Sequence, residues 1–219
     1  MIKSKQMFWF SLTLLSVSMI LNFPFPHKYP IGEAISIALN IPLSFANGFH
    51  TVGLITLLLL ITGLYFLSKS LRKNRGRFVF IAILIVSFVP IFIIDSYQKT
   101  LAKGIYAVSY SSEQSNYSFE MANEGILHGE CSLSFRNNSN KEVRFTVEFY
   151  EDPHFRSNPP TVSLLNHTVP FEVILGAKES KRVHFEKSID VSSMENHIHS
   201  GGGTGVNIII KSGEKSRNL

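Results

Sequence analysis

Uninterrupted apolar stretches mark the N-terminal half of the chain, whereas apolar and polar residues alternate in the C-terminal half. No charged side chain occurs in residues 51–67 or in residues 78–94. Each stretch is about seventeen residues long, close to the lower limit for a helix that crosses a hydrocarbon core of roughly 30 Å. The pattern therefore predicts two transmembrane helices in these stretches.

A further apolar stretch, residues 7–22, lies near the N-terminus and follows Lys3 and Lys5. A positively charged start and an apolar middle also occur in secretory signals, but here bulky residues follow where a signal peptidase requires small ones. We expect an uncleaved helix. The N-terminal region, residues 1–98, is thus predicted to be a bundle of three transmembrane helices.

Segment 31–46 is less apolar than these stretches. Glu33, Ser36 and Asn40 recur at helical spacing and would form a polar stripe on a helix. Pro42 argues against a long uninterrupted span. The segment is predicted to be an amphipathic helix that lies at the membrane interface, or alternatively a fourth transmembrane helix.

A short basic loop sets the expected topology. Its charged residues are Lys69, Arg72, Lys73, Arg75 and Arg77. Short loops rich in lysine and arginine remain in the cytoplasm, so residues 68–77 are predicted to be cytoplasmic. The following span then leads outward, and residues 99–219 become an extracytoplasmic domain of a multi-pass cell-membrane protein. This conclusion holds whether or not segment 31–46 crosses the bilayer.

The C-terminal domain shows the alternation of strands with one buried face, as in segments 129–136 and 142–150. Turn-forming residues 137–142 join these segments, which predicts an antiparallel hairpin. A second hairpin is predicted from 169–175 and 182–189. Segments 105–110 and 206–211 are the expected first and last strands. The fold class is therefore an α+β membrane protein with an all-β, immunoglobulin-like sandwich; a jelly roll and a small barrel remain alternatives.

The succession of strands and turns in 133–150 and near Gly176 resembles the immunoglobulin-like extracellular modules of Gram-positive membrane proteins. The resemblance covers about half of the C-terminal domain and includes no diagnostic motif. It implies the sandwich fold only.

Several kinds of chemistry lack support in the sequence. The single cysteine, Cys131, excludes an intramolecular disulfide and a multi-thiolate metal site, and its place on an apolar strand face predicts an inert, buried thiol. The glycine-rich segment 201–205 is not followed by the Lys-Ser/Thr of a phosphate-binding loop, so we expect a flexible turn or bulge. No serine lies in a Gly-x-Ser-x-Gly motif. We expect a non-enzymatic protein that does not bind nucleic acid.

Histidines supply the candidate metal site. His197 and His199 are alternate residues that would point to the same side of an extended segment, and His184 lies on a nearby predicted strand. Imidazoles of this kind, with Glu186 or Glu195, can bind zinc or copper. The competing interpretation is a polar loop that contains histidines by chance, and no other cofactor is expected.

A polar and aromatic loop rich in proline is the candidate partner contact, because recognition residues often lie on loops held by a rigid scaffold. Its proposed contact residues are Asp152, His154, Phe155 and Arg156.

These observations favour a membrane protein of the cell envelope whose extracytoplasmic domain binds a protein, a peptide or a wall component. Its partners would be the lipid bilayer and another membrane or envelope protein. Two alternatives are a zinc- or copper-binding envelope protein and an accessory or immunity subunit of a membrane complex.

Overall fold

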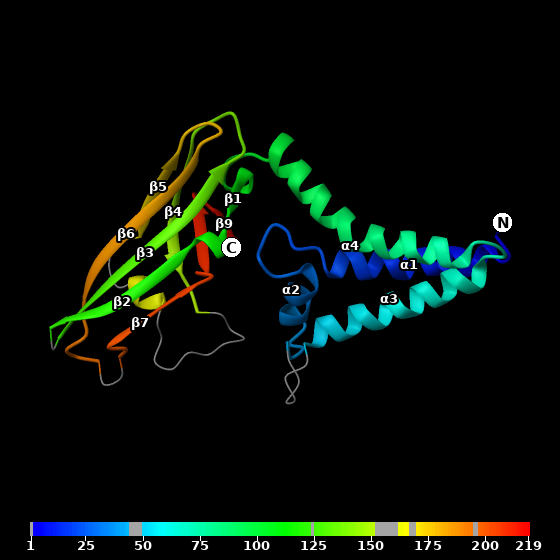
Figure 1. Cartoon of the computed structure of the whole chain (residues 1–219), viewed down its shortest axis with the longest axis horizontal. Coiled ribbons are helices and arrows are strands. Elements are labelled where there is room, and N and C mark those ends of the chain that lie inside the picture. The colour runs from blue at the N-terminus through cyan, green and yellow to red at the C-terminus, as the bar shows by residue number, and fades with distance from the viewer. Residues whose placement is uncertain (1, 44–49, 124, 152–161, 167–169, 195–196) are drawn as a thin grey trace. The chain divides into compact units, whose positions relative to one another are not determined.

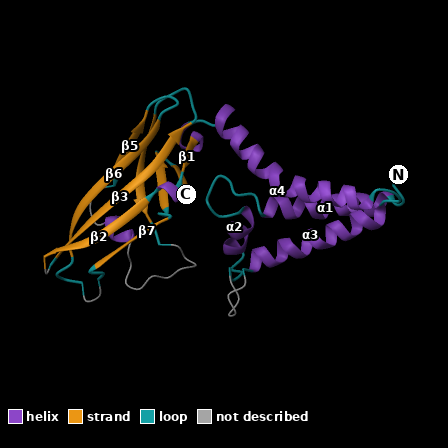
Figure 2. Ribbon diagram, viewed as in Figure 1, coloured by secondary structure: helices purple, strands orange, loops and turns teal. Residues whose placement is uncertain are grey.

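The computed structural model describes residues 2–43, 50–123, 125–151, 162–166, 170–194 and 197–219. The fold is α+β, with helices in the N-terminal part and antiparallel sheets in the C-terminal part (Figure 2). The chain divides into two compact units, Met1–Asp95 and Ser96–Leu219. The division lies close to residue 98, where the sequence predicts the membrane region to end.

The described part of the N-terminal unit contains the α-helices labelled in Figure 1, except for the last turn of α4. They are α1 (Lys5–Leu21), α2 (Ile31–Ala38), α3 (Thr51–Ser70) and α4 (Arg75–Thr100). Both α3 and α4 are long and apolar enough to cross a membrane, and α1 is a shorter apolar helix. Most apolar side chains of α4 are exposed.

Helices α1 and α3 pack closely through small and hydroxylated residues. Ser11 Oγ donates to Gly63 O at 2.9 Å, and Ser18 Oγ donates to Thr56 O at 3.0 Å. A Cβ at Gly63 would lie 2.9 Å from Leu15 Cδ2, so this glycine permits the approach. Small residues and interhelical hydrogen bonds of this kind hold transmembrane helices together, because lipid supplies no hydrophobic force between them.

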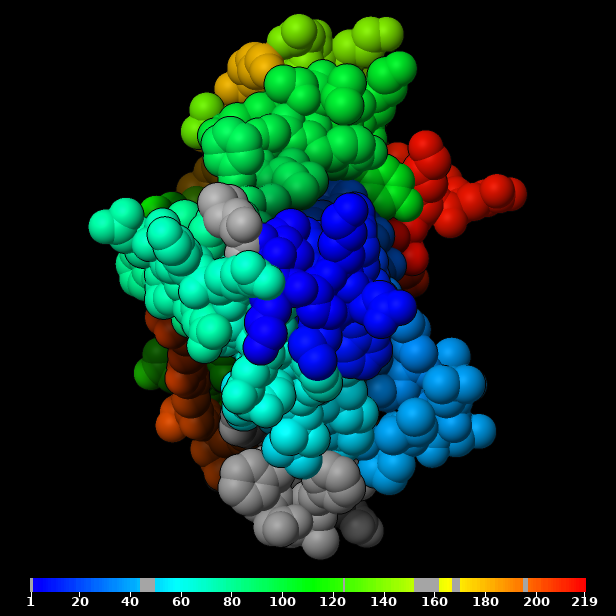
Figure 3. Space-filling view, turned by 90° about the vertical axis from the view of Figure 1, so that its right-hand side faces the viewer, coloured from blue at the N-terminus to red at the C-terminus, as the bar shows by residue number. Residues whose placement is uncertain are grey.

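The N-terminus and the end of α3 lie at the same end of this unit. Ile2 and Leu71 form an antiparallel β-bridge, and Lys3 N donates to Ser70 O at 2.6 Å. Figure 3 shows this end, with the N-terminus in blue beside the turn from α3 to α4. Helices α1 and α3 therefore run antiparallel between the two ends of this unit.

The amphipathic helix is shorter than the sequence predicts. Helix α2 ends at Ala38, and Asn40 has a positive φ of 53°. Its eight residues would rise only about 12 Å, compared with roughly 30 Å for a hydrocarbon core. A Cβ at Gly32 would lie 2.6 Å from Val52 Cγ1, so α2 is instead packed against α3.

The described part of the C-terminal unit contains two antiparallel sheets. The strands are β1 (Val108–Tyr110), β2 (Asn116–Asn123), β3 (Ile126–Asn137), β4 (Val143–Phe149), β5 (Phe171–Leu175), β6 (Ser180–Asp190), β7 (Ser200–Thr204), β8 (Ile208–Ser212) and β9 (Lys215–Asn218). In the first sheet, β3 pairs with β1 and β2 and also with β6, and β7 is paired to β2; the second sheet has the order β5-β4-β8-β9.

The two sheets share one hydrophobic core. Phe135 of β3 lies edge-on to Phe145 of β4, with ring centroids 5.3 Å apart. Phe185 of β6 contacts Phe171 of β5 at 4.3 Å between centroids. These aromatic pairs join strands of different sheets, so the inner faces of both sheets are buried against each other.

Both predicted hairpins are wrong. Strands β3 and β4 lie in different sheets, and so do β5 and β6. Instead, β3 pairs with β6 from Ile126↔Asp190 to Arg136↔Ser180, and β4 pairs with β5. Alternation shows which residues of a strand face the core, but it does not show which strand lies beside it.

Asn137 explains how the chain crosses between the sheets. Its buried amide Nδ2 donates to Lys141 O and to Gly176 O, each at 2.8 Å, and its backbone N donates to Glu179 O at 2.8 Å. One asparagine thus joins the β3–β4 loop to the β5–β6 loop, and both loops cross between the sheets at the same end of the unit.

Other predictions for this unit hold in part. Of predicted strand 105–110, only β1 is extended, since Gly104–Ala107 forms a 3-10 turn. Predicted strand 206–211 corresponds to β8, and β9 follows it. The glycine-rich segment is not a turn, because β7 pairs with β2 from Asn116↔Thr204 to Glu120↔Ser200.

The last turn of α4 belongs to the C-terminal unit and is held there by Arg217. This arginine is buried, and Nη1 donates to Val108 O at 2.6 Å. The side-chain amide of Gln98 is oriented with its oxygen toward the guanidinium group. This oxygen accepts a hydrogen bond from Arg217 Nη2 at 3.1 Å. Burial lowers the pKa of Arg217 to about 10, so the guanidinium remains charged at neutral pH.

Candidate functional site

The outer face of the first sheet carries a group of polar side chains on neighbouring strands. Cys131 of β3 and Phe185 of β6 are buried, so the residues next to them in sequence point outward. Ser132 and His184 are direct cross-strand partners on this face, and so are Glu130 and Glu186. The pairing of β3 with β6 therefore brings together residues that are about fifty positions apart in the chain.

Ser132, His184 and Glu186 form a continuous chain of hydrogen bonds. Ser132 Oγ lies 2.9 Å from His184 Nδ1, and His184 Nε2 lies 3.0 Å from Glu186 Oε1. A neutral imidazole that carries its proton on Nε2 donates to the carboxylate and accepts from the serine. Both imidazole nitrogens are thus engaged, which fixes the ring on the face of the sheet.

The same connection of serine, histidine and carboxylate occurs in nucleophilic serine sites. Such sites also need N–H groups that can stabilise an oxyanion. Here β3 is paired on both sides, with β2 and with β6, and the N–H groups near Ser132 therefore lie within the sheet ladders. In addition, the side chains of His184 and Glu186 are 49% and 59% exposed. The arrangement is better suited to binding a polar ligand than to acyl transfer.

A hollow of about 460 Å³ adjoins this chain of hydrogen bonds. The polar residues that line it are Asn116, Ser118, Glu130, Ser132, His184 and Thr204. Strand β7 borders it and carries consecutive glycines in place of side chains. A Cβ at Gly202 would lie 2.8 Å from Tyr117 O, so the close approach of β7 to β2 requires glycine there. The hollow offers hydroxyl, amide, imidazole and carboxylate groups to a ligand.

Cys131 also borders the hollow, but its side chain is only 1% exposed. Burial raises the pKa of the Cys131 thiol to about 12. The thiolate, which is the reactive form, is therefore scarce at neutral pH. This agrees with the inert core cysteine that the sequence predicts.

The structure separates the histidines of the candidate metal site into two groups. His197 and His199 lie together, with ring centroids 4.9 Å apart, whereas His184 contacts Ser132 and Glu186. Within the described residues, no three histidine, cysteine or carboxylate side chains are gathered so that they could hold a metal ion. Glu195 lies outside the described residues.

The candidate partner contact of Asp152, His154, Phe155 and Arg156 also lies outside the described residues. The residue that precedes this segment, Glu151, is described. Its carboxylate Oε1 accepts hydrogen bonds from Ser163 N at 3.0 Å and from Ser163 Oγ at 3.1 Å.

Sequence reasoning missed Ser132, Glu130 and the hollow beside them. Their alternation with Cys131 and Leu133 places them on an outward face, but only the pairing of β3 with β6 brings His184 opposite Ser132. Pairing information was therefore the missing signal.

Comparison of the chain with protein-family models, with curated proteins and with solved structures finds no match.

Proposed function

We propose that this chain is a non-enzymatic integral membrane protein of the cell envelope. Its C-terminal unit is an extracytoplasmic, immunoglobulin-like sandwich that binds a hydrophilic wall glycan. The observation that carries the proposal is the polar hollow between β7 and the hydrogen-bonded chain of Ser132, His184 and Glu186.

The proposed topology is supported by the helices and by the distribution of charge. Helices α3 and α4 are long and apolar enough to span, and the basic residues of 68–77 lie between them. Such loops stay in the cytoplasm, so α4 leads the chain outward. The bridge between Ile2 and Leu71 supports a cytoplasmic N-terminus with α1, α3 and α4 as three spans.

The proposed sandwich is supported by two antiparallel sheets that share one core and by the loops that cross between them. Both features are typical of immunoglobulin-like domains.

The nature of the ligand follows from the lining of the hollow. A glycan presents many hydroxyl groups, and Glu130, Asn116 and Ser118 can accept from or donate to them. Hydrogen bonds to a charged group contribute about 1.5–3 kcal/mol, so the carboxylate of Glu130 is the residue to test first.

The test uses the full chain in detergent and measures its co-sedimentation with insoluble peptidoglycan. Glu130→Gln should weaken binding by about tenfold or more, since about 1.4 kcal/mol corresponds to a factor of ten. Glu172→Gln is the matched control, because Glu172 is an exposed carboxylate on β5 of the other sheet. Equal binding by both variants, or no binding by the unchanged chain, would refute the proposed ligand.

The topology is tested separately with reporters fused after Ile94 and within residues 68–77. A reporter that is active only outside the cytoplasm should work at the first position alone, and the opposite result would overturn the placement of the C-terminal unit.

A further inference from the structure

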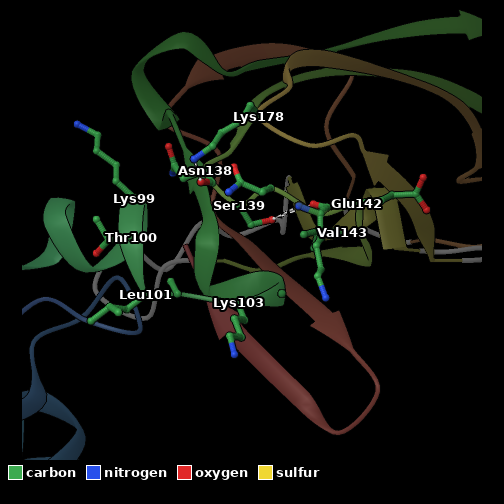
Figure 4. A pocket seen from close by; sticks show the side chains of 13 residues that line it. Lys99, Thr100, Leu101, Lys103, Asn138, Ser139, Glu142, Val143 and Lys178 are labelled. Carbon is green, nitrogen blue, oxygen red and sulfur yellow. Dashed lines mark hydrogen bonds between the residues drawn. The ribbon is translucent and has the colours of Figure 1, made fainter.

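A second hollow, of about 330 Å³, lies in the C-terminal unit and is lined by basic side chains. We call it the lysine pocket and define it by Lys99, Lys103, Lys141 and Lys178, together with Ser139 and Asn140. Lys99 belongs to the last turn of α4, Lys103 follows that helix, and Lys178 lies in the β5–β6 turn (Figure 4). Lys141 lies in the β3–β4 loop.

Hydrogen bonds join the segments that form the lysine pocket. Asn138 is buried, and its Nδ2 donates to Ala107 O at 3.1 Å and to Ser109 Oγ at 2.7 Å. Lys178 Nζ donates to Asn138 O at 2.5 Å, and Lys178 N donates to Ser139 O at 3.0 Å. The backbone of the pocket is therefore formed before any ligand arrives.

The charge of the lysine pocket selects an anion. Four lysines line it, against the single carboxylate of Glu142. Glu142 Oε1 already accepts from Arg144 Nε at 2.7 Å. Figure 4 shows Lys99 and Lys103 extending in different directions from the backbone. Their flexible four-carbon stems allow the ammonium groups to turn toward a bound anion.

The position of the lysine pocket along the chain indicates where that anion lies. Lys99 follows the last apolar residue of the predicted span, Ile94, by five positions on the same helix. At 1.5 Å per residue this is about 7 Å, which is comparable to the thickness of one headgroup layer. Leu101, on the rim, is 70% exposed. An exposed apolar side chain among lysines is typical of a surface at the membrane interface.

From these observations we infer that the lysine pocket binds the phosphate headgroup of an anionic membrane lipid. This inference rests on the part of the proposed function that makes α4 a membrane span, and it does not depend on glycan binding. The lysines supply the positive charge, Asn140 and Ser139 supply further hydrogen-bonding groups, and Leu101 contacts the start of the acyl chains.

The experiment uses the full chain in detergent micelles and native mass spectrometry to measure lipid affinity. Phosphatidylglycerol, phosphatidylcholine and inorganic phosphate are added separately. The test variant is Lys103→Gln/Lys141→Gln, and the matched control is Lys181→Gln/Lys215→Gln, which removes the same charge from exposed positions on β6 and β9.

Phosphatidylglycerol should bind the unchanged chain more tightly than phosphatidylcholine. The test variant should lose affinity for phosphatidylglycerol by about fivefold for each lysine, the usual contribution of one basic residue beside an anionic surface. The control variant should keep its affinity. Inorganic phosphate should displace little of the lipid.

Equal affinity for the two lipids, or an equal loss in both variants, would overturn the inference. Displacement of the lipid by inorganic phosphate at equal concentration would show a site for free phosphate instead of a lipid. Peptidoglycan co-sedimentation of the test variant is measured in parallel and should be unchanged, because Glu130 is unchanged in that variant. A failure of the lipid inference is thereby distinguished from a failure of the glycan proposal.

Discussion

Ser132 and His184 lie directly opposite each other on β3 and β6, and the serine Oγ is 2.9 Å from the imidazole Nδ1. A slip of one residue in the register of these strands would turn one of the two side chains into the core. The candidate site is therefore tied to the strand pairing that also buries Cys131 and Phe185. Substitutions that disturb the sheet and substitutions that change the ligand-binding groups must be distinguished by measuring stability and binding separately.

The chain contains its own probes for the stability of each unit. Cys131 is the only cysteine and is buried in the core of the C-terminal unit, so the rate of its labelling reports opening of that unit. Trp9 is the only tryptophan and lies on α1, so its fluorescence reports the helical unit.

The close approach of β7 to β2 predicts that two neighbouring glycines respond differently to alanine. A Cβ at Gly202 would lie 2.8 Å from the backbone oxygen of Tyr117, whereas a Cβ at Gly201 meets nothing within 4 Å among the described residues. Gly202→Ala should lower the free energy of unfolding by about 1–3 kcal/mol, because backbone must shift to relieve the contact. Gly201→Ala should change it by less than about 0.5 kcal/mol. Denaturant titration with Cys131 labelling measures both, and equal effects would contradict the placement of β7.

Asn137 is expected to contribute strongly to the stability of the C-terminal unit. Asn137→Ala removes the donor from Lys141 O and Gly176 O at the two loops that cross between the sheets. Each of these hydrogen bonds contributes about 0.5–1.5 kcal/mol, so we expect a loss of about 1–3 kcal/mol. Asn140→Ala, at an exposed position of the same loop, is the control. If both variants unfold at the same denaturant concentration, Asn137 does not hold the crossing.

The buried thiol of Cys131 predicts slow chemical modification. Burial raises its pKa to about 12, so the thiolate fraction at pH 8 is about one in ten thousand. Iodoacetamide should label the folded chain at pH 8 far more slowly than the chain unfolded in guanidinium chloride. Mass spectrometry of the labelled protein measures the ratio of the two rates, and rapid labelling of the folded chain would show that the first sheet opens readily.

Tyr110 predicts a loss of stability at alkaline pH. Its hydroxyl donates to Val206 O at 2.7 Å, and burial raises its pKa. The folded chain therefore keeps a proton that the unfolded chain releases near pH 10, so the contribution of Tyr110 to stability is complete below that pH and is lost as the pH rises further.

The variant Tyr110→Phe isolates this effect. Its free energy of unfolding should be lower at pH 8 because the hydrogen bond is gone, and it should fall less steeply between pH 9 and pH 11. Circular dichroism during urea unfolding measures both quantities. Parallel pH profiles of the two proteins would show that Tyr110 does not titrate on unfolding in this range.

Much of the fold follows from periodicity alone. Apolar stretches predict the positions of α1, α3 and α4, and alternation predicts β3, β4 and β6, because these patterns record which faces avoid water. Strand β2 and the glycine strand β7 escaped prediction. Strand β2 shows the same alternation, with Tyr117, Phe119 and Met121 between polar residues, so its sequence carried the signal. Strand β7 has almost no side chains by which a buried face could be recognised.

The sheet pairing and the candidate site could not be predicted in the same way. Turn-forming residues such as Asn137 and Asn138 also suit a loop that crosses between sheets, so turn chemistry did not distinguish a hairpin from a crossing. Ser132 and His184 meet only through that pairing. The lysine pocket likewise depends on loops that are brought together by buried amides rather than on a sequence motif.

Gly63 predicts how the helical unit depends on close packing of α1 against α3. Gly63→Ala places a Cβ 2.9 Å from Leu15 Cδ2, whereas Gly53→Ala, on the same helix, meets only an ordinary contact with His50 Cβ at 3.6 Å. Alanine has a higher helix propensity than glycine, by about 1 kcal/mol, at both positions. Comparing the two variants with each other therefore cancels this gain in stability. Gly63→Ala should therefore be less stable than Gly53→Ala by about 1–3 kcal/mol. Thermal unfolding in detergent followed by Trp9 fluorescence measures the difference, while Cys131 labelling should remain the same in both variants. A Gly63→Ala variant as stable as Gly53→Ala would mean that α1 and α3 are not packed through this glycine.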